Sequence, residues 1–263
     1  MKEKMSIRQT EIISRVSEAG RISVSGLAQS LGISEVTVRK DLKFLAEKGI
    51  LRKEQGYAAL RDAEDIRFHM ALHYESKRLI AESAAEFVGE GETIMVESGS
   101  TCIIFAMVLA ETGRRVNIIT NSAYLAELSR EWPNIQLIML GGEYQKSCQA
   151  VVGPLTKMGA GEFRVGKIFV GTDGYSEKFG FTGDDMTRAE TVRAMTKCAA
   201  RTFVLAEASK FLYPGTVSFL QPQEVSVLIT DEELGEEQDK QLRSHGVRIL
   251  TTGSHDRKED RRF

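Results

Sequence analysis

The sequence predicts an α/β protein with two domains: a small helical domain that ends in a β-hairpin, and a larger domain on a largely parallel sheet. Three observations carry this prediction. Two short amphipathic stretches flank a glycine at position 32, and two short apolar runs flank a turn near residue 55. From residue 92 onward, short runs rich in β-branched residues alternate with helix-length segments. A chain of 263 residues is long enough for both domains to bury a core.

The N-terminal helices are placed by their apolar spacing. Residues 6–19 form the first expected helix, which ends at Gly20, and residues 21–23 can pair as a short strand. A shorter helix over 24–31 and a turn at Gly32 and Ile33 lead into residues 34–45, SEVTVRKDLKFL. A short helix, a turn that contains glycine and a second helix form a helix-turn-helix arrangement.

The second helix of this pair has two different faces. At about 100° per residue, Val38, Leu42 and Leu45 fall on one side. Ser34 precedes the helix and can cap it, whereas Thr37 stands where a glutamate or glutamine would complete a capping box. The opposite side is a mainly basic ridge of four residues: Val36, Arg39, Lys40 and Lys43.

Taken alone, this stretch fits an ordinary amphipathic helix with a solvated charged face. The preceding helix and turn favour DNA binding instead, because the second helix of such a motif enters the major groove. There, basic side chains bind guanine edges and methyl groups contact thymine. We therefore expect operator contacts from this set: Ser34, Val36, Thr37, Arg39, Lys40 and Lys43.

A β-hairpin is expected directly after these helices. Residues 50–53 and 57–60 flank a turn that contains Gly56. Three helices followed by a hairpin make a winged helix, whose hairpin lies along the DNA backbone. Arg52 and Lys53 would then contact phosphates, and the alternative for both is plain surface charge.

Composition limits the class of protein. The content of 42% hydrophobic and 27% charged residues is that of a globular chain rather than a disordered or fibrous one. The longest apolar run, 103–110, is far shorter than the roughly 20 residues of a membrane helix, and the N-terminus has no apolar signal core, so we expect a cytoplasmic protein. Cys102, Cys148 and Cys198 are widely spaced, which favours buried free thiols over a disulfide or zinc site.

Charge is divided unevenly along the chain. Residues 1–60 hold 11 Lys and Arg against 7 Asp and Glu, a balance of +4, whereas the remainder carries −6. A basic small end favours nucleic acid as its partner, and an acidic large end favours a different partner. The expected boundaries are a DNA-binding domain over 1–60, a linker over 61–75 and a second domain over 76–263.

The second domain is expected to be an α/β domain in which ligands bind beyond the carboxyl ends of the strands. The expected strands are residues 92–97, 116–120, 135–140, 167–171, 202–206 and 225–230, and the clearest helices between them are 101–111, 123–130 and 189–201. The first strand is followed by a run of small residues at a helix start: Glu97, Ser98, Gly99, Ser100 and Thr101. Free backbone N–H groups and the helix dipole favour an anion such as a phosphate there. The alternative is a simple capped turn.

Other strand ends also carry polar side chains. Lys210 supplies a cation that a phosphate would bind, and Asn121 and Asp173 can form hydrogen bonds with hydroxyl groups. Each alone is most often a solvated loop residue. Together they favour a binding site, because one ligand at the carboxyl edge of the sheet could touch all of them.

These motifs resemble the DeoR family of bacterial transcription regulators over almost the whole chain. The N-terminal match is SEVTVRKDLKFLAEKGILRKEQGYAAL, and the later matches, in order, are ESGST, ITNS, LGGEYQKS, VGP, GTDGYSEKFGFT and ASKF. The resemblance implies a winged helix-turn-helix domain joined to a sugar-phosphate sensor domain related in fold to ribose-5-phosphate isomerase. It also implies a homo-oligomeric repressor of carbohydrate uptake and catabolism genes that leaves its double-stranded DNA operator when a phosphorylated sugar binds. The family pattern places Ser98 to Thr101 and Lys210 at the phosphate and Asp173 at the sugar.

The chain also departs from the family pattern. Tyr57 replaces a glycine of the wing, and Glu97 stands where aspartate is common. Glu207 and Ala208 also replace a segment that more often contains aspartate, so the pocket is expected to be narrower or differently shaped.

Two alternatives stay open on sequence. One is an activator, or a regulator of another metabolite, and the other is a sugar-phosphate isomerase. The related isomerases carry two acids where this chain has Asp173 and Ser176, although Glu177 and Glu190 lie nearby in sequence. We therefore expect no catalytic residue, no metal site and no cofactor.

Overall fold

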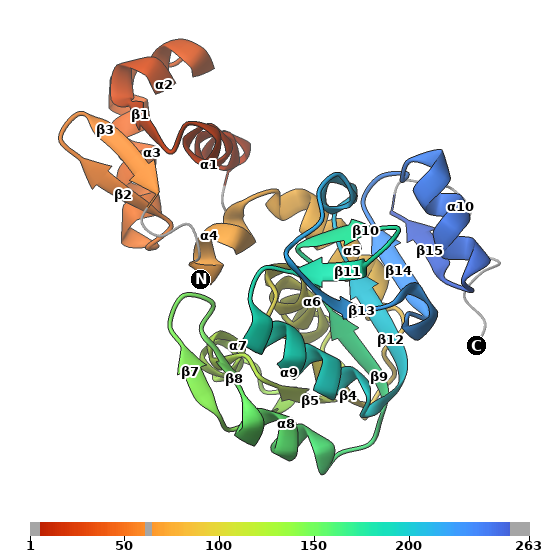
Figure 1. The fold of residues 1–263 in the computed structure, drawn as a ribbon. Helices are drawn as coiled ribbons and strands as arrows, with labels where there is room; N and C mark the ends of the chain where they lie inside the picture. The colour runs from red at the N-terminus through yellow and green to blue at the C-terminus, as the bar shows by residue number, and fades with distance from the viewer. Residues whose placement is uncertain (1–5, 61–64, 253–263) are drawn as a thin grey trace. The chain divides into compact units, whose positions relative to one another are not determined.

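The computed structural model describes residues 6–60 and 65–252, and the chain divides into two compact units, residues 1–74 and 75–263. Figure 1 labels the elements of each unit, and each unit is considered by itself. The expected linker, 61–75, lies partly outside the described residues, at 61–64.

The first unit is a helix-turn-helix followed by a hairpin, as predicted. Its helices are α1 (Ile7–Ala19), α2 (Val24–Leu31), α3 (Glu35–Glu47) and α4 (Ile66–Ala71). Its strands β1 (Arg21–Ser23), β2 (Leu51–Glu54) and β3 (Tyr57–Leu60) form an antiparallel sheet in the order β1-β3-β2. The short segment before α2 therefore pairs with the hairpin.

Local sequence explains where these helices begin and end. The Ser34 side chain accepts a hydrogen bond from Thr37 N at 3.2 Å and caps α3. Gly32 ends α2 at a φ of 64°, a left-handed conformation that glycine adopts without steric cost. The apolar faces meet in one core, where Val38, Leu42 and Leu45 are at most 1% exposed. Phe68 and Ala71 of α4 belong to the same core, so part of the expected linker is packed structure.

The second unit is built on a seven-stranded parallel sheet in the order β15-β14-β12-β9-β4-β5-β6. The strands are β4 (Thr93–Val96), β5 (Val116–Thr120), β6 (Ile135–Met139), β9 (Val165–Val170), β12 (Ala199–Leu205), β14 (Val227–Thr230) and β15 (Arg248–Thr251). The helices are α5 (Tyr74–Ala85), α6 (Ser100–Glu111), α7 (Ala123–Ser129), α8 (Pro154–Gly161), α9 (Met186–Thr196) and α10 (Glu236–Ser244). All seven strands run the same way, so the segments after them share one edge of the sheet.

Smaller elements surround this sheet. A hairpin is formed by β7 (Glu143–Gln145) and β8 (Ala150–Val152). A second antiparallel sheet contains β10 (Gly174–Ser176), β11 (Gly180–Gly183) and β13 (Val217–Leu220). Two short 3-10 helices, η1 (Ala208–Phe211) and η2 (Pro222–Glu224), follow β12 and β13. Among the described residues, no helix is long and apolar enough to cross a membrane.

Candidate functional site

The outer ridge of α3 is exposed as the sequence predicted. Val36 at its start is 75% exposed, and Arg39, Lys40 and Lys43 face solvent. Arg39 Nη2 lies 2.7 Å from Glu35 Oε2, and Lys43 Nζ lies 3.9 Å from Glu47 Oε1. Both pairs join exposed residues four apart on one helix, an arrangement that contributes only a few tenths of a kcal/mol. The basic groups can therefore leave these partners for DNA at little cost.

The hairpin carries its own charge network. Glu54 accepts hydrogen bonds from Arg21 Nε at 2.9 Å and from Arg52 Nη2 at 2.7 Å. The hydrogen bond from Arg21 is the main reason that the pKa of Glu54 is lowered. The Arg21 guanidinium also lies over the Tyr57 ring, 3.9 Å from its centroid. Tyr57, which departs from the family pattern, is thus stacked on a cation. Lys53 remains exposed on β2.

Asp41 is a site-supporting residue that the sequence prediction missed. It lies on the buried side of α3, is 3% exposed and accepts hydrogen bonds from α1. The sequence does indicate this role. Asp41 lies between Val38 and Leu42 on the apolar side of the helix, where a buried charged residue needs a partner.

The loop after β4 is held by the carboxylate of Glu97. Glu97 Oε2 accepts from Gly99 N at 2.7 Å and from Gly171 N at 3.4 Å, and Oε1 accepts from Ser98 Oγ at 3.0 Å. Glu97 and Ser98 are buried. The Ser98 hydroxyl and the Gly99 amide therefore already have acceptors, and the ends of β4 and β9 are joined through one side chain.

The first turn of α6 follows this loop directly. Gly99 is its N-cap and provides no side-chain cap. Ser100 is half-buried and Thr101 is 5% exposed. Backbone N–H groups in the first turn have no intrahelical acceptor, so they and the helix dipole favour an anion at this position.

Asn121 comes from the end of β5 and reaches the same loop. Its Nδ2 donates to Val151 O at 3.2 Å and to Ser98 Oγ at 3.4 Å, and its side chain is fully buried. Val151 O can only accept, which fixes the orientation of the amide. Within the described residues, Asn121 Oδ1 has no hydrogen-bond partner. An unpartnered buried acceptor costs about 1–3 kcal/mol and marks a place where a donor would be favourable.

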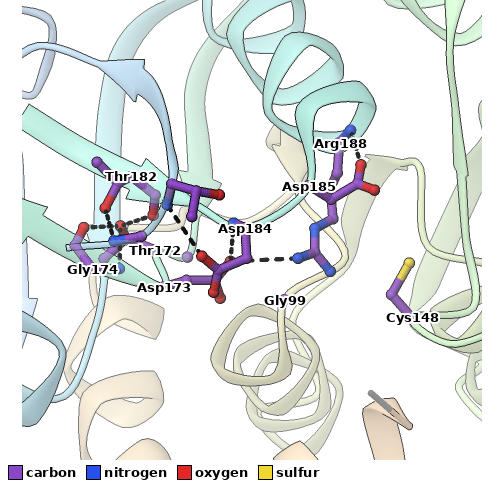
Figure 2. Close-up of polar contacts among 12 residues, drawn as sticks. Gly99, Cys148, Thr172, Asp173, Gly174, Thr182, Asp184, Asp185 and Arg188 are labelled. Atoms are coloured by element: carbon purple, nitrogen blue, oxygen red, sulfur yellow. Dashed lines mark hydrogen bonds and ion pairs between the residues drawn. The ribbon is translucent and has the colours of Figure 1, made fainter. Parts of the chain in front are cut away.

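Arg188 of α9 meets Asp173 at the carboxyl edge of the sheet (Figure 2). Arg188 Nη2 lies 3.4 Å from Asp173 Oδ2, and Asp173 Oδ2 also accepts from Asp184 N at 3.3 Å. Asp185 accepts from Arg188 N at 2.6 Å and caps α9. Burial opposes the charged form of Arg188, but the carboxylates of Asp173 and Glu97 outweigh it and raise the pKa of the guanidinium.

Comparisons with known proteins agree with this architecture. A family model described as the DeoR C terminal sensor domain matches residues 72–232, which is more than half of the chain, and a DeoR-like helix-turn-helix domain matches residues 8–64. The chain belongs to the DeoR family.

Relatives of this DeoR-family chain carry regulator names. The HTH-type transcriptional regulators GlpR of Haloferax volcanii and UlaR of Shigella dysenteriae are each 27% identical; the matches cover 92% of this chain and 96% and 97% of theirs. A proposed aga operon transcriptional repressor of Escherichia coli O157:H7 is 26% identical over 94% of both chains. Ribose 5 phosphate isomerase A of Neisseria gonorrhoeae is 20% identical with a TM-score of 0.39, over 51% of this chain and 52% of its own.

Lys210 of the DeoR-family ASKF motif lies close to a buried ion pair. It follows β12 in η1, one turn after Glu207, whose Oε1 lies 2.8 Å from Lys77 Nζ in a buried ion pair. Burial is the main cause that lowers the pKa of Lys77; Glu207 opposes this, and the charge of Lys210 adds to it. β12 and β9 are neighbours in the sheet, so Lys210 and Asp173 follow adjacent strands at the same edge.

Proposed function

We propose that this DeoR-family chain is a sequence-specific DNA-binding repressor of carbohydrate uptake or catabolism genes, released by a phosphorylated sugar. Its relatives are named as transcriptional regulators, one of them as a repressor of the aga operon. The observation that carries the proposal is the combination, in one chain, of an exposed basic helix α3 and a helix start that favours an anion. We place its action in the cytoplasm, where bacterial operator DNA lies.

The output is DNA binding by the first unit. Val36, Arg39, Lys40 and Lys43 of α3 would contact base edges and phosphates in the major groove, with Ser34 and Thr37 at the helix start. Arg52 and Lys53 of the hairpin would contact the phosphate backbone, which supports affinity without specifying sequence. Two or four copies of the chain would act together, since paired recognition helices must meet the same face of the duplex about one helical turn apart.

The input is a ligand in the second unit. Its phosphate would lie at the start of α6, near Ser100 and Thr101. Sugar hydroxyl groups would donate to Asp173 and to Asn121 Oδ1, which has no partner among the described residues. Such a ligand can release DNA only if it binds more tightly to the state with low operator affinity.

Binding without turnover is part of the proposal. An aldose–ketose isomerase needs a base and a second group that handles the hydroxyl proton. Of the two acids that the sequence left open, Glu177 is exposed and Glu190 is paired with Lys157 at 2.9 Å. The acids beside Asp173 are instead Asp184, which accepts from Thr216 N, and Asp185, which caps α9. We expect no isomerisation when the protein is incubated with aldose and ketose phosphates; measurable turnover would contradict this part.

Two measurements test the proposed function. A thermal-shift screen of phosphorylated sugars should find at least one that raises the melting temperature, because a ligand that binds only the folded state stabilises it by mass action. In vitro transcription from the promoter beside this gene should be reduced by the protein and restored by that sugar. Transcription that increases on adding the protein would indicate an activator instead.

A further inference from the structure

A largely buried arginine at the carboxyl edge of the sheet is absent from the site residues that the sequence predicts. Arg188 lies in the first turn of α9, and its side chain is 22% exposed. A guanidinium has five N–H donors. Among the described residues, the only carboxylate hydrogen-bonded to this guanidinium is Asp173, at the long distance of 3.4 Å. Cys148 also interacts with the guanidinium. The fold therefore places this cation without a close carboxylate partner.

Arg188 lies beside the loop that starts α6. Figure 2 shows its guanidinium directed from α9 toward Asp173, and Cys148 is close enough for the guanidinium to act on its pKa. Glu97, which accepts from Gly99 N, acts electrostatically on Arg188 together with Asp173. Arg188 is thus the cation that offsets the negative charge of Glu97 and Asp173 where an anion would approach the helix.

An independent observation indicates a ligand at this loop. Asn121 is fully buried, its Nδ2 is hydrogen-bonded to Ser98 Oγ, and its Oδ1 has no partner among the described residues. A hydroxyl group next to a phosphate would satisfy that acceptor.

We propose that Arg188 is a cation that binds the phosphate of the effector at the start of α6, and that Asp173 competes with the phosphate for the guanidinium. This inference rests on the proposed function. The planar guanidinium can bind two phosphate oxygens at once, which a lysine cannot do.

If Asp173 and phosphate compete for Arg188, substitutions of Arg188 and of Asp173 should change the phosphate affinity in opposite directions. Arg188→Gln removes the cation and should weaken phosphate binding. Asp173→Asn keeps the side-chain shape, removes a negative charge and frees the guanidinium, so it should tighten binding of inorganic phosphate. A merely structural role for the Arg188–Asp173 pair would make both substitutions act in the same direction.

The test is calorimetric titration of the full chain with inorganic phosphate at constant ionic strength. We expect Arg188→Gln to weaken the apparent affinity about tenfold or more, and Arg188→Lys to lose an intermediate amount. Asp173→Asn should bind more tightly than the wild type. Lys197→Gln is the matched control, because it removes one exposed positive charge at the opposite end of α9, and it should stay within about twofold of the wild type.

Several results would overturn the inference: no phosphate binding by the wild type, unchanged binding by Arg188→Gln, a loss in Lys197→Gln as large as in Arg188→Gln, or weaker binding by Asp173→Asn. A wild-type denaturation midpoint of the second unit in each variant shows that it is folded, and if Arg188→Gln does not fold, Arg188→Lys and Asp173→Asn decide the outcome. If the wild type binds phosphate but no operator, the proposed function fails and the Arg188 assignment stands. If a sugar phosphate releases the wild type and Arg188→Gln equally, the assignment fails and the function stands.

Discussion

Asp41 on the inner side of α3 accepts two hydrogen bonds from the Arg8 guanidinium of α1, at 2.6 and 3.2 Å. Gln9 Nε2 adds a third at 3.1 Å. The hydrogen bond to Asp41 is the main cause that raises the pKa of Arg8. A charged contact with α1, on the side of α3 opposite the exposed ridge, therefore helps to fix the orientation of the ridge.

Replacing Asp41 by alanine should destabilise the first unit by about 2 kcal/mol, because charge-assisted hydrogen bonds to a buried carboxylate are lost. The effect is measured by urea denaturation, from the unfolding transition of the first unit, and by operator affinity. Glu35→Gln is the matched control: it removes an exposed acid of the same helix and should change stability by less than about 0.5 kcal/mol. Equal stability of the two variants would refute the anchoring role of Asp41.

Arg39→Ala and Lys53→Ala should weaken DNA binding in different ways. Loss of a base contact by Arg39 should cost about 1–3 kcal/mol at the operator and relax specificity. Loss of a phosphate contact by Lys53 should weaken binding evenly across sequences and lower the salt slope by about one. Anisotropy titrations with operator and scrambled DNA at several salt concentrations separate the two effects. An Arg39→Ala variant that binds the operator like the wild type would remove α3 as the recognition surface.

The buried Lys77–Glu207 pair predicts a large loss of stability when one partner is removed. Lys77→Met leaves the Glu207 carboxylate buried without its cation, and breaking such a pair costs about 3–5 kcal/mol. The double variant Lys77→Met/Glu207→Leu should regain most of that loss, because neither charge then remains buried. Denaturation midpoints of the second unit test this. A double variant that is no more stable than Lys77→Met would contradict this prediction.

The environment of Tyr175 predicts that the protein loses stability at alkaline pH. Its hydroxyl donates to Gln241 Oε1 at 2.8 Å, and burial, assisted by the charge of Glu177, raises its pKa from 10.0 to about 12. Because the pKa of Tyr175 is higher in the folded state, its protonated hydroxyl contributes to the free energy of unfolding. That contribution is complete below pH 10 and is lost as the pH rises toward 12. Absorbance titration of the tyrosines should show one that ionises late in the folded protein and disappears in Tyr175→Phe. A titration curve that Tyr175→Phe leaves unchanged at its alkaline end would contradict the assignment.

Local patterns in the sequence predicted most of the helices and parallel strands and the edge where polar groups gather. They missed α8 and α10, and the helix expected over 189–201 ends earlier, because 199–201 belong to β12. Ser34 and Gly32 mark helix ends through their own conformational preferences, so the helix-turn-helix could be found without tertiary information. Asp41 and Arg8 are 33 positions apart, and their contact depends on how α1 packs on α3.

The antiparallel sheet of β10, β11 and β13 was not predicted, because its strands have only three or four residues each and show no alternation. Arg188 was missed for a related reason. It faces Asp173 only because the β10–β11 hairpin returns the chain to the end of β9, a topology that no local motif specifies.

The most direct test of the central claim is release of the full-length protein from DNA of its own upstream region, followed by fluorescence anisotropy during addition of aldose and ketose phosphates. We predict that at least one phosphorylated sugar lowers the anisotropy to that of free DNA, and that the same sugar without phosphate has no effect. DNA binding that no phosphorylated sugar reverses, or release that is equally efficient without the phosphate group, would contradict a sugar-phosphate-controlled repressor.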